Sequence, residues 1–157
     1  MDEITDEITD KINDERLIEL ALAARGNAYA PYSGFAVGAA VAFDSGHVYQ
    51  GCNVEAASYG ATNCAERTAV FAGVAAGEVK NGGRIAKVAV VGGKCDSSLD
   101  FCPPCGICLQ VISEFACGEQ CEILLARARL IAGKHEVVET KKYQLADLLP
   151  LGFGLPK

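Results

Sequence analysis

The sequence predicts a layered α/β domain, because apolar strand-like runs alternate with helix-like segments along most of the chain. Its 157 residues are enough for one domain with a hydrophobic core, and an apolar fraction of 50% against 22% charged residues is typical of a compact globular protein. No linker or repeat of domain size interrupts the chain. We therefore expect a single domain over residues 14–157, preceded by an acidic extension over residues 1–13 that is too polar to fold alone.

The first part of the domain predicts one helix followed by a β-hairpin. Asn13 is a suitable N-cap for a helix over residues 15–24, whose leucines and alanines form one apolar stripe. Two apolar strands are expected over residues 36–43 and 48–52. The Asp-Ser-Gly sequence at residues 44–46 suits the tight turn between them.

The rest of the domain predicts further helices and strands in alternation. A loop over residues 53–63 leads into an alanine-rich helix over residues 64–76, and a second helix follows over residues 105–115. The remaining predicted elements are buried strands over residues 87–91 and 122–126, a weaker edge strand over residues 136–139 and a short helix over residues 143–149.

Composition excludes some classes of partner and points to a reducing compartment. The net charge is −6 and no cluster of lysine or arginine is present, which argues against nucleic acid as a substrate. No apolar run approaches the ~20 residues that span a bilayer, and the first residues are acidic where an export signal would be basic and then apolar. We therefore expect a cytoplasmic protein without membrane contact. In that compartment the eight cysteines favour metal ligation or buried free thiols over disulfides.

The most informative pattern is formed by three cysteines in two short motifs. Cys64 opens a Cys-Ala-Glu motif, and Cys105 and Cys108 form a C-x-x-C pair about 40 residues later. Three thiols can hold a zinc ion and leave its fourth position open. Cys64 and Cys105 both fall at predicted helix starts, where free backbone N–H groups and the helix dipole favour thiolates. This pattern is typical of a catalytic metal site rather than a structural one.

Two neighbours of Cys64 complete the predicted chemistry. From the start of the helix, Glu66 can reach the open fourth position, take a proton from water there and deliver it to a ring nitrogen of a substrate. Three thiolates carry more negative charge than one zinc ion neutralises, so Arg67, hydrogen-bonded to a sulfur, would restore the acidity of that water. These residue types together suit hydrolytic deamination.

Five sequence blocks, covering the chain from about Tyr29 to Gly154, resemble the small homotetrameric zinc-dependent cytidine deaminases. They are YAPYSGFAVGAA (29–40), GCNVE (51–55), CAERTA (64–69), PCGIC (104–108) and LLP (148–150). The resemblance implies a three-layer α/β/α fold with a central mixed five-stranded sheet. It also implies an enzyme that converts cytidine and 2′-deoxycytidine to uridine and 2′-deoxyuridine plus ammonia, in pyrimidine salvage, with one zinc ion per subunit.

The resemblance also assigns roles to individual residues: it implies that Cys64, Cys105 and Cys108 ligate zinc and that Glu66 is the proton shuttle. It implies that Asn53 and Glu55 bind the ribose, that Phe35 packs on the pyrimidine and that the backbone of Ala65 contacts the base. Phe153 is implied to reach the site of a neighbouring subunit. Residues two apart on an extended segment point to the same side, which suits the ribose-binding pair. A site shared in this way would make activity depend on homotetramer assembly.

The sequence departs from the family pattern at several positions, and two alternatives to cytidine deamination stay open. Leu109 stands where an arginine usually follows the last cysteine, and Cys102 adds a thiol three residues before Cys105. Ala56 and Pro103 replace a common asparagine and a common serine. One alternative is a deaminase of another cytosine nucleoside such as blasticidin S. The other is a non-catalytic module in which four cysteines, including Cys102, close a zinc site or hold an iron–sulfur cluster. His47 and His135 are predicted surface residues.

Overall fold

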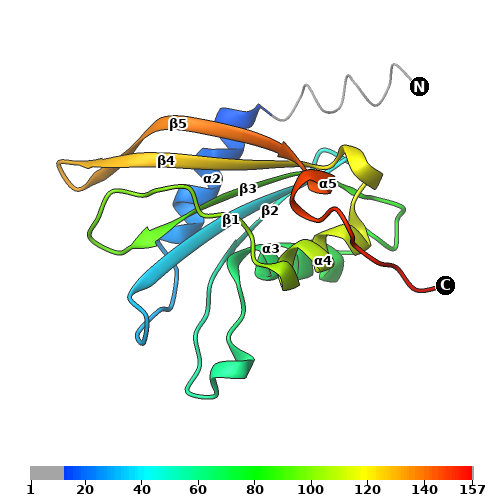
Figure 1. Cartoon of the computed structure of the whole chain (residues 1–157), viewed down its shortest axis with the longest axis horizontal. Helices are drawn as coiled ribbons and strands as arrows, with labels where there is room; N and C mark the ends of the chain where they lie inside the picture. Colours follow the sequence, from blue (N-terminus) through cyan, green and yellow to red (C-terminus); the bar gives the residue numbers. More distant parts are fainter. Residues whose placement is uncertain (1–12, 157) are drawn as a thin grey trace.

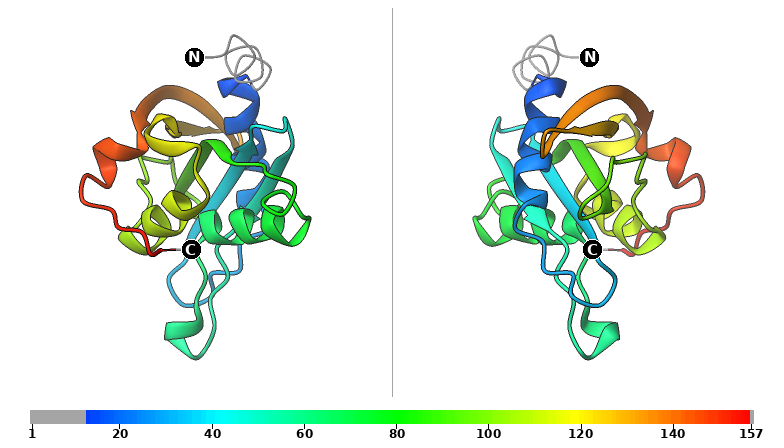
Figure 2. Two further views of the ribbon diagram at one scale, coloured as in Figure 1. Left: turned by 90° about the vertical axis from the view of Figure 1, so that its right-hand side faces the viewer. Right: turned by 90° about the vertical axis from the view of Figure 1, so that its left-hand side faces the viewer.

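The computed structural model describes residues 13–156, so residues 1–12 of the predicted extension lie outside the described part of the chain. A five-stranded sheet forms the middle layer, with α2 on one face and α3 and α4 on the other (Figures 1 and 2). The elements are α2 (Asp14–Arg25), β1 (Phe35–Phe43), β2 (Val48–Cys52), η1 (Tyr59–Ala61), α3 (Ala65–Ala75), β3 (Ile85–Lys94), α4 (Gly106–Phe115), η2 (Gly118–Gln120), β4 (Glu122–Ile131), β5 (Lys134–Gln144) and α5 (Leu145–Leu148).

The sheet is mixed and lies between the two helix layers, which confirms the predicted three-layer α/β/α class. Its strand order is β2-β1-β3-β4-β5. β1 pairs antiparallel with both β2 and β3, β3 pairs parallel with β4, and β4 pairs antiparallel with β5. A parallel pair needs a crossover connection, and α4 supplies it between β3 and β4. The crossover brings the start of α4 next to α3 on the same face of the sheet.

Both faces of the central strands are buried, and each face has its own apolar core. On the α2 face, Leu17 and Ala21 pack against Ala40 and Val91. On the other face, Val70 of α3 belongs to a core with strand residues such as Phe43 and Val88 and with Ile112 of α4. The buried strands therefore read as continuous apolar runs, as the sequence predicted. Within residues 13–156, no helix combines the length and apolar character needed to cross a membrane.

The N-terminal elements follow the sequence closely, whereas the C-terminal ones differ. Asn13 caps α2 as predicted, because its side chain accepts a hydrogen bond from Glu15 N at 2.8 Å. The predicted helix over residues 143–149 is wrong at its start, because Tyr143 belongs to β5 and pairs with Ile123. β5 is also much longer than the predicted edge strand over residues 136–139. Most of its residues are exposed, so the burial alternation that identifies a strand is missing.

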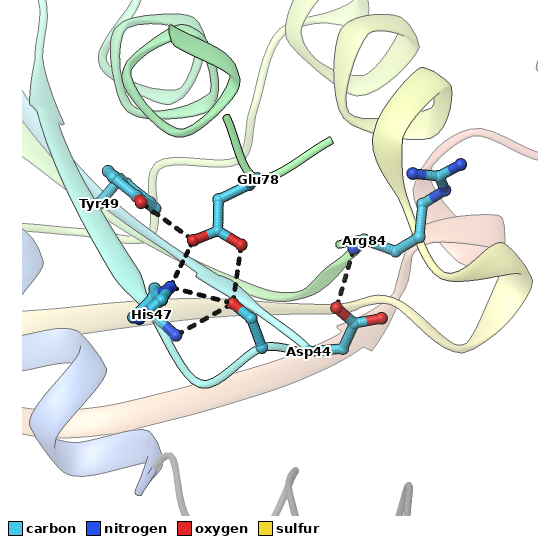
Figure 3. Close-up of polar contacts among 6 residues, drawn as sticks. Asp44, His47, Tyr49, Glu78 and Arg84 are labelled. Carbon is cyan, nitrogen blue, oxygen red and sulfur yellow. Dashed lines mark hydrogen bonds and ion pairs between the residues drawn. The ribbon is translucent and has the colours of Figure 1, made fainter. Parts of the chain in front are cut away.

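A polar cluster joins the β1–β2 turn and Tyr49 of β2 to Glu78, three residues after the end of α3 (Figure 3). The Glu78 carboxylate is 7% exposed and accepts hydrogen bonds from Ser45 Oγ at 2.7 Å and Tyr49 Oη at 2.9 Å, and it contacts His47 Nδ1 at 2.5 Å. Burial alone would raise the pKa of Glu78, but the hydrogen bonds from Ser45, His47 and Tyr49 lower it overall. His47 is 71% exposed, consistent with its predicted surface position.

Candidate active site

Three cysteine sulfurs converge where α3 and α4 begin. The Sγ atoms of Cys64, Cys105 and Cys108 all lie within 4.8 Å of one another, and those of Cys64 and Cys105 are 3.9 Å apart. Zinc–sulfur bonds of about 2.3 Å in a tetrahedron place two sulfurs about 3.8 Å apart. The sulfur spacing therefore fits a zinc ion held by three thiolates.

Helix N-termini position the sulfurs, as the sequence predicted. Cys64 is the N-cap of α3 and Cys105 is the N-cap of α4, and neither side chain is used for capping. The turn at Cys64 is instead supported by Thr68, whose Oγ1 donates to Cys64 O at 3.1 Å and accepts from Asn63 Nδ2 at 3.0 Å. Sequence reasoning missed this pair. An asparagine immediately before a predicted helix, five residues ahead of a threonine, was the available signal.

Arg67 is the cation that contacts the sulfurs, as predicted. Its Nη2 donates to Cys64 Sγ at 3.4 Å. The hydrogen bond with Cys108 and then Arg67 lower the pKa of Cys64 to about 5, and the same bond with Cys64 raises the pKa of Cys108. Leu109 is buried in the apolar core and brings no charge to this cluster. The Arg67 Nε atom is also buried and has no hydrogen-bond partner among the described residues.

Glu66 lies beside the sulfurs but is not one of the clustered ligand groups. Its side chain is 4% exposed in the first turn of α3. Burial raises the pKa of the Glu66 carboxyl, and the neighbouring charge of Cys64 raises it further. Interactions with Cys108 and Arg67 act in the opposite direction. A raised pKa is the direction expected of a carboxyl group that accepts and returns a proton during catalysis.

Cys102 does not join the sulfur cluster. It packs against β3, where a Cβ atom added to Gly92 would lie 2.8 Å from the Cys102 sulfur. Burial raises the pKa of its thiol to about 11, with smaller contributions from Glu66 and Cys64. The closed four-cysteine site considered from the sequence is therefore not formed by these residues.

The predicted ribose-binding pair lies on the loop that follows β2. Glu55 accepts hydrogen bonds from Tyr32 N at 2.9 Å and Ser33 N at 3.2 Å, and its other oxygen accepts from Ser33 Oγ. The bond from Ser33 is the main cause of a lowered Glu55 pKa. These residues, with Tyr59 and Thr62, line a cavity of about 370 Å³. Glu55 is thus fixed as a carboxylate at the edge of an open cavity.

Asn53 links the end of β2 to the start of β1 through its side-chain amide. Its Oδ1 accepts from Val37 N at 2.8 Å, and its Nδ2 donates to Phe35 O at 2.8 Å. Phe35 is 40% exposed, so its ring is partly free. Asn53 therefore orients the backbone that carries Phe35 and keeps one N–H for a ligand. The side chain of Ala65 is fully buried at the first position of α3.

Phe153 lies on the segment after α5, and its ring is 69% exposed. It lines two surface cavities of about 440 and 380 Å³ beside α4. No cysteine lines either cavity, and neither does Glu66. Of the predicted site residues, the structure brings together Cys64, Cys105, Cys108, Arg67 and Glu66, while Phe153 occupies a separate surface.

Comparisons with known proteins agree with this geometry. The cytidine and deoxycytidylate deaminase zinc-binding region matches residues 11–123. A cytidine deaminase from Sporosarcina psychrophila is 41% identical over 140 residues, which cover 89% of this chain and 90% of that protein. The crystal structure of a cytidine deaminase from Burkholderia pseudomallei superposes with a TM-score of 0.71 at 42% identity, covering 90% of this chain and 100% of that one. The structure of the Mycobacterium tuberculosis cytidine deaminase gives a TM-score of 0.68 at 38% identity, covering 92% and 99%.

The three cysteines of the sulfur cluster, Cys64, Cys105 and Cys108, all lie within the matched region. Sequence identity and fold agree over most of the chain. This chain belongs to the cytidine and deoxycytidylate deaminase zinc-binding family.

Proposed function

We propose that this protein hydrolyses cytidine and 2′-deoxycytidine to the corresponding uridines and ammonia, as an enzyme of pyrimidine salvage in the cytoplasm. The observation that carries the proposal is the convergence of three cysteine sulfurs within 4.8 Å beside the buried Glu66. The relatives that bear the name cytidine deaminase support the choice of substrate. Because all eight cysteines are free thiols, a reducing compartment suits the chain.

One zinc ion per subunit is held by Cys64, Cys105 and Cys108. When bound, zinc supplies a Lewis acid that makes water a nucleophile at neutral pH. Arg67 offsets the negative charge of the three thiolates through its bond to Cys64. Glu66 accepts a proton from the attacking water, transfers it to the pyrimidine ring nitrogen and then assists the departure of ammonia.

The substrate is oriented by residues of three segments. The Glu55 carboxylate, which lines the cavity, and the remaining Asn53 N–H on the same loop bind the ribose hydroxyls. Phe35 packs on the pyrimidine, and the backbone at Ala65 contacts the base, because N–H groups in the first turn of a helix have no partner within the helix. A nucleoside with a plain ribose therefore suits this site better than blasticidin S.

Four copies of the chain assemble, and Phe153 completes the site of a neighbouring copy. The exposed apolar side chains near α3, α4 and the C-terminal segment support assembly, since a monomer rarely leaves such a set uncovered. They are Phe71, Ile107, Leu151, Phe153 and Leu155, with exposed fractions between 47% and 91%.

The test of this function is a spectrophotometric assay with zinc-loaded protein. Loss of cytosine absorbance is expected with cytidine and with deoxycytidine, and little or none with blasticidin S. Glu66→Gln should lower kcat by about 10²- to 10⁴-fold, the usual contribution of a general acid–base, and should retain its zinc. Glu136→Gln, an exposed site on β5, serves as the matched control and should leave the rate unchanged. An inactive wild-type protein, or a fully active Glu66→Gln variant, would refute the proposal.

A further inference from the structure

The C-terminal segment is attached to α4 by the side-chain amide of Gln110. Gln110 Nε2 donates to Phe153 O at 2.7 Å, and Phe153 N donates to Gln110 Oε1 at 3.5 Å. One amide therefore satisfies both backbone polar groups of a single residue, as a neighbouring strand would do. Among the side chains of the described residues, no other hydrogen bond to the Phe153 backbone is seen.

Gln110 is itself held in place on α4. It is half-buried and lies two residues after Cys108. Its Nε2 is 3.3 Å from Ser113 Oγ, and that hydroxyl donates to Gln110 O at 2.7 Å. Because Cys105 and Cys108 are carried by the first turn of the same helix, α4 connects the sulfur cluster rigidly to the C-terminal segment.

The segment around Phe153 buries little of its own side chains. Leu151 is 91% exposed, Phe153 is 69% exposed and Leu155 is 76% exposed. Such side chains contribute little to holding the segment on its own subunit. The Gln110 bonds fix the Phe153 backbone while the ring faces outward, which is the arrangement needed when the ring acts on another molecule.

We propose that Gln110 is a positioning residue: it holds the Phe153 backbone in the place from which the Phe153 ring reaches the substrate site of a neighbouring copy. The inference rests on the proposed function, because that function places the Phe153 ring beside the substrate. The hydrogen bonds of Gln110 to other described side chains and to the C-terminal segment are with Ser113 and Phe153 and not with the sulfurs, so its proposed effect on the substrate passes through Phe153.

A double-mutant cycle tests this coupling. Gln110→Ala should raise the KM for cytidine about fivefold, the loss expected for one hydrogen-bonded contact, with kcat within about twofold and zinc content unchanged. Gln110→Glu should behave like Gln110→Ala, because it keeps the side-chain volume but cannot donate to Phe153 O. Adding Gln110→Ala to Phe153→Ala should cause no further loss. Additive effects of the two substitutions, or an unchanged KM in Gln110→Ala, would overturn the proposal.

The matched control is Gln50→Ala. Gln50 Nε2 also donates to a backbone carbonyl, that of Leu20, at 2.7 Å, but it lies on β2 against α2. Its loss removes the same type of bond away from the C-terminal segment. The KM should stay at the wild-type value, so a rise in Gln50→Ala equal to that in Gln110→Ala would assign the effect to general destabilisation and contradict the proposal.

A second readout does not depend on activity. The chain has no tryptophan, so Phe153→Trp introduces a single tryptophan whose fluorescence can be excited selectively over that of the five tyrosines. Adding Gln110→Ala to this variant should lower the fluorescence anisotropy and increase acrylamide quenching, whereas adding Gln50→Ala should change neither. Unchanged anisotropy and quenching would show that Gln110 does not hold the segment. Wild-type protein without deaminase activity would defeat the proposed function, while the reporter would still decide whether Gln110 positions Phe153.

Discussion

Cys64 interacts with three groups that together decide its charge. It is the N-cap residue of α3, it is hydrogen-bonded to Cys108, and it accepts a hydrogen bond from Arg67. Each of these favours the thiolate, which is the form that binds metal. The clustering of Cys64, Cys105 and Cys108 could be predicted from the C-A-E and C-x-x-C motifs, since spacing and helix position are local properties. The packing of Cys102 away from the cluster depends on β3 and was not predictable from spacing.

Arg67 supplies the first prediction. Arg67→Gln removes the guanidinium from Cys64 and leaves the excess negative charge of the sulfurs uncompensated. Turnover of cytidine should fall about 10- to 100-fold, which is the usual effect of removing a residue that hydrogen-bonds to a metal ligand. Most of the zinc should stay bound. Metal analysis and kcat on the same preparation check this. Arg16→Gln, an exposed residue paired with Glu19, is the control. Full turnover in a zinc-replete Arg67→Gln variant would remove Arg67 from the mechanism.

At the scale of elements, the candidate site lies where α3 and α4 begin, so its geometry depends on how these helix starts are packed. β2 approaches the first turn of α3 closely, since a methyl group at Gly51 would overlap the Ala65 carbonyl oxygen and the Ala69 amide nitrogen. Those contacts are backbone atoms, which cannot rotate away. The position of the α3 N-terminus, and with it Cys64, is therefore set by the absence of a side chain at Gly51.

The second prediction follows from this contact. Gly51→Ala should force α3 away from β2, cost about 1–3 kcal/mol of stability as overpacking usually does, and weaken zinc retention during dialysis. Gly60→Ala is the matched control, because a Cβ at Gly60 meets no atom within 4 Å. Thermal unfolding and metal content of both variants are the measurements. A Gly51→Ala protein with wild-type stability and zinc content would contradict the proposed role of this contact.

The third prediction concerns the Glu78 cluster at the other end of α3. The folded-state pKa of Glu78 lies below the ordinary value of 4.5. The stability that its carboxylate contributes is therefore complete above pH 4.5 and is lost as the pH falls through the folded-state pKa. Glu78→Gln should lower the free energy of unfolding by about 1 kcal/mol near pH 7, and this difference should shrink as the pH falls below about 4.5. Unfolding curves at several pH values test it, with Glu136→Gln as the exposed control. A pH-independent difference would exclude the charged carboxylate as the cause.

Elements with one buried face or two were predictable, whereas only the middle of the exposed β5 strand, residues 136–139, was predicted and its full extent was not. The helix stripe, the hairpin turn and the buried strands each follow from local patterns of apolar residues. β5 is held by its register with β4, for example by the pairing of Tyr143 with Ile123, and this information lies elsewhere in the chain. Tertiary pairing therefore overrode the local helix signal around Tyr143.

At the scale of the whole molecule, the candidate active site and the exposed apolar surface lie apart. The sulfurs and Glu66 lie together where α3 and α4 begin, whereas the exposed Phe153 is carried on the C-terminal segment beside α4. A site completed by a neighbour would explain why the ring is presented and not buried. The sequence indicated this only through family resemblance, since no local pattern reveals which surface meets another copy.

The fourth prediction tests sharing of the site directly. Glu66→Gln lacks the proton shuttle but retains Phe153, and Phe153→Ala retains Glu66 but lacks the ring. Each variant alone should be impaired. When the two are mixed, dissociated and reassembled, sites that combine Glu66 of one copy with Phe153 of another should form at random. Deaminase activity should then rise to about a quarter of the wild-type value, the statistical share of such sites in a mixed symmetric assembly. Mixing without reassembly is the control and should give no gain. Activity equal to the mean of the two separate variants after reassembly would mean that each copy completes its own site.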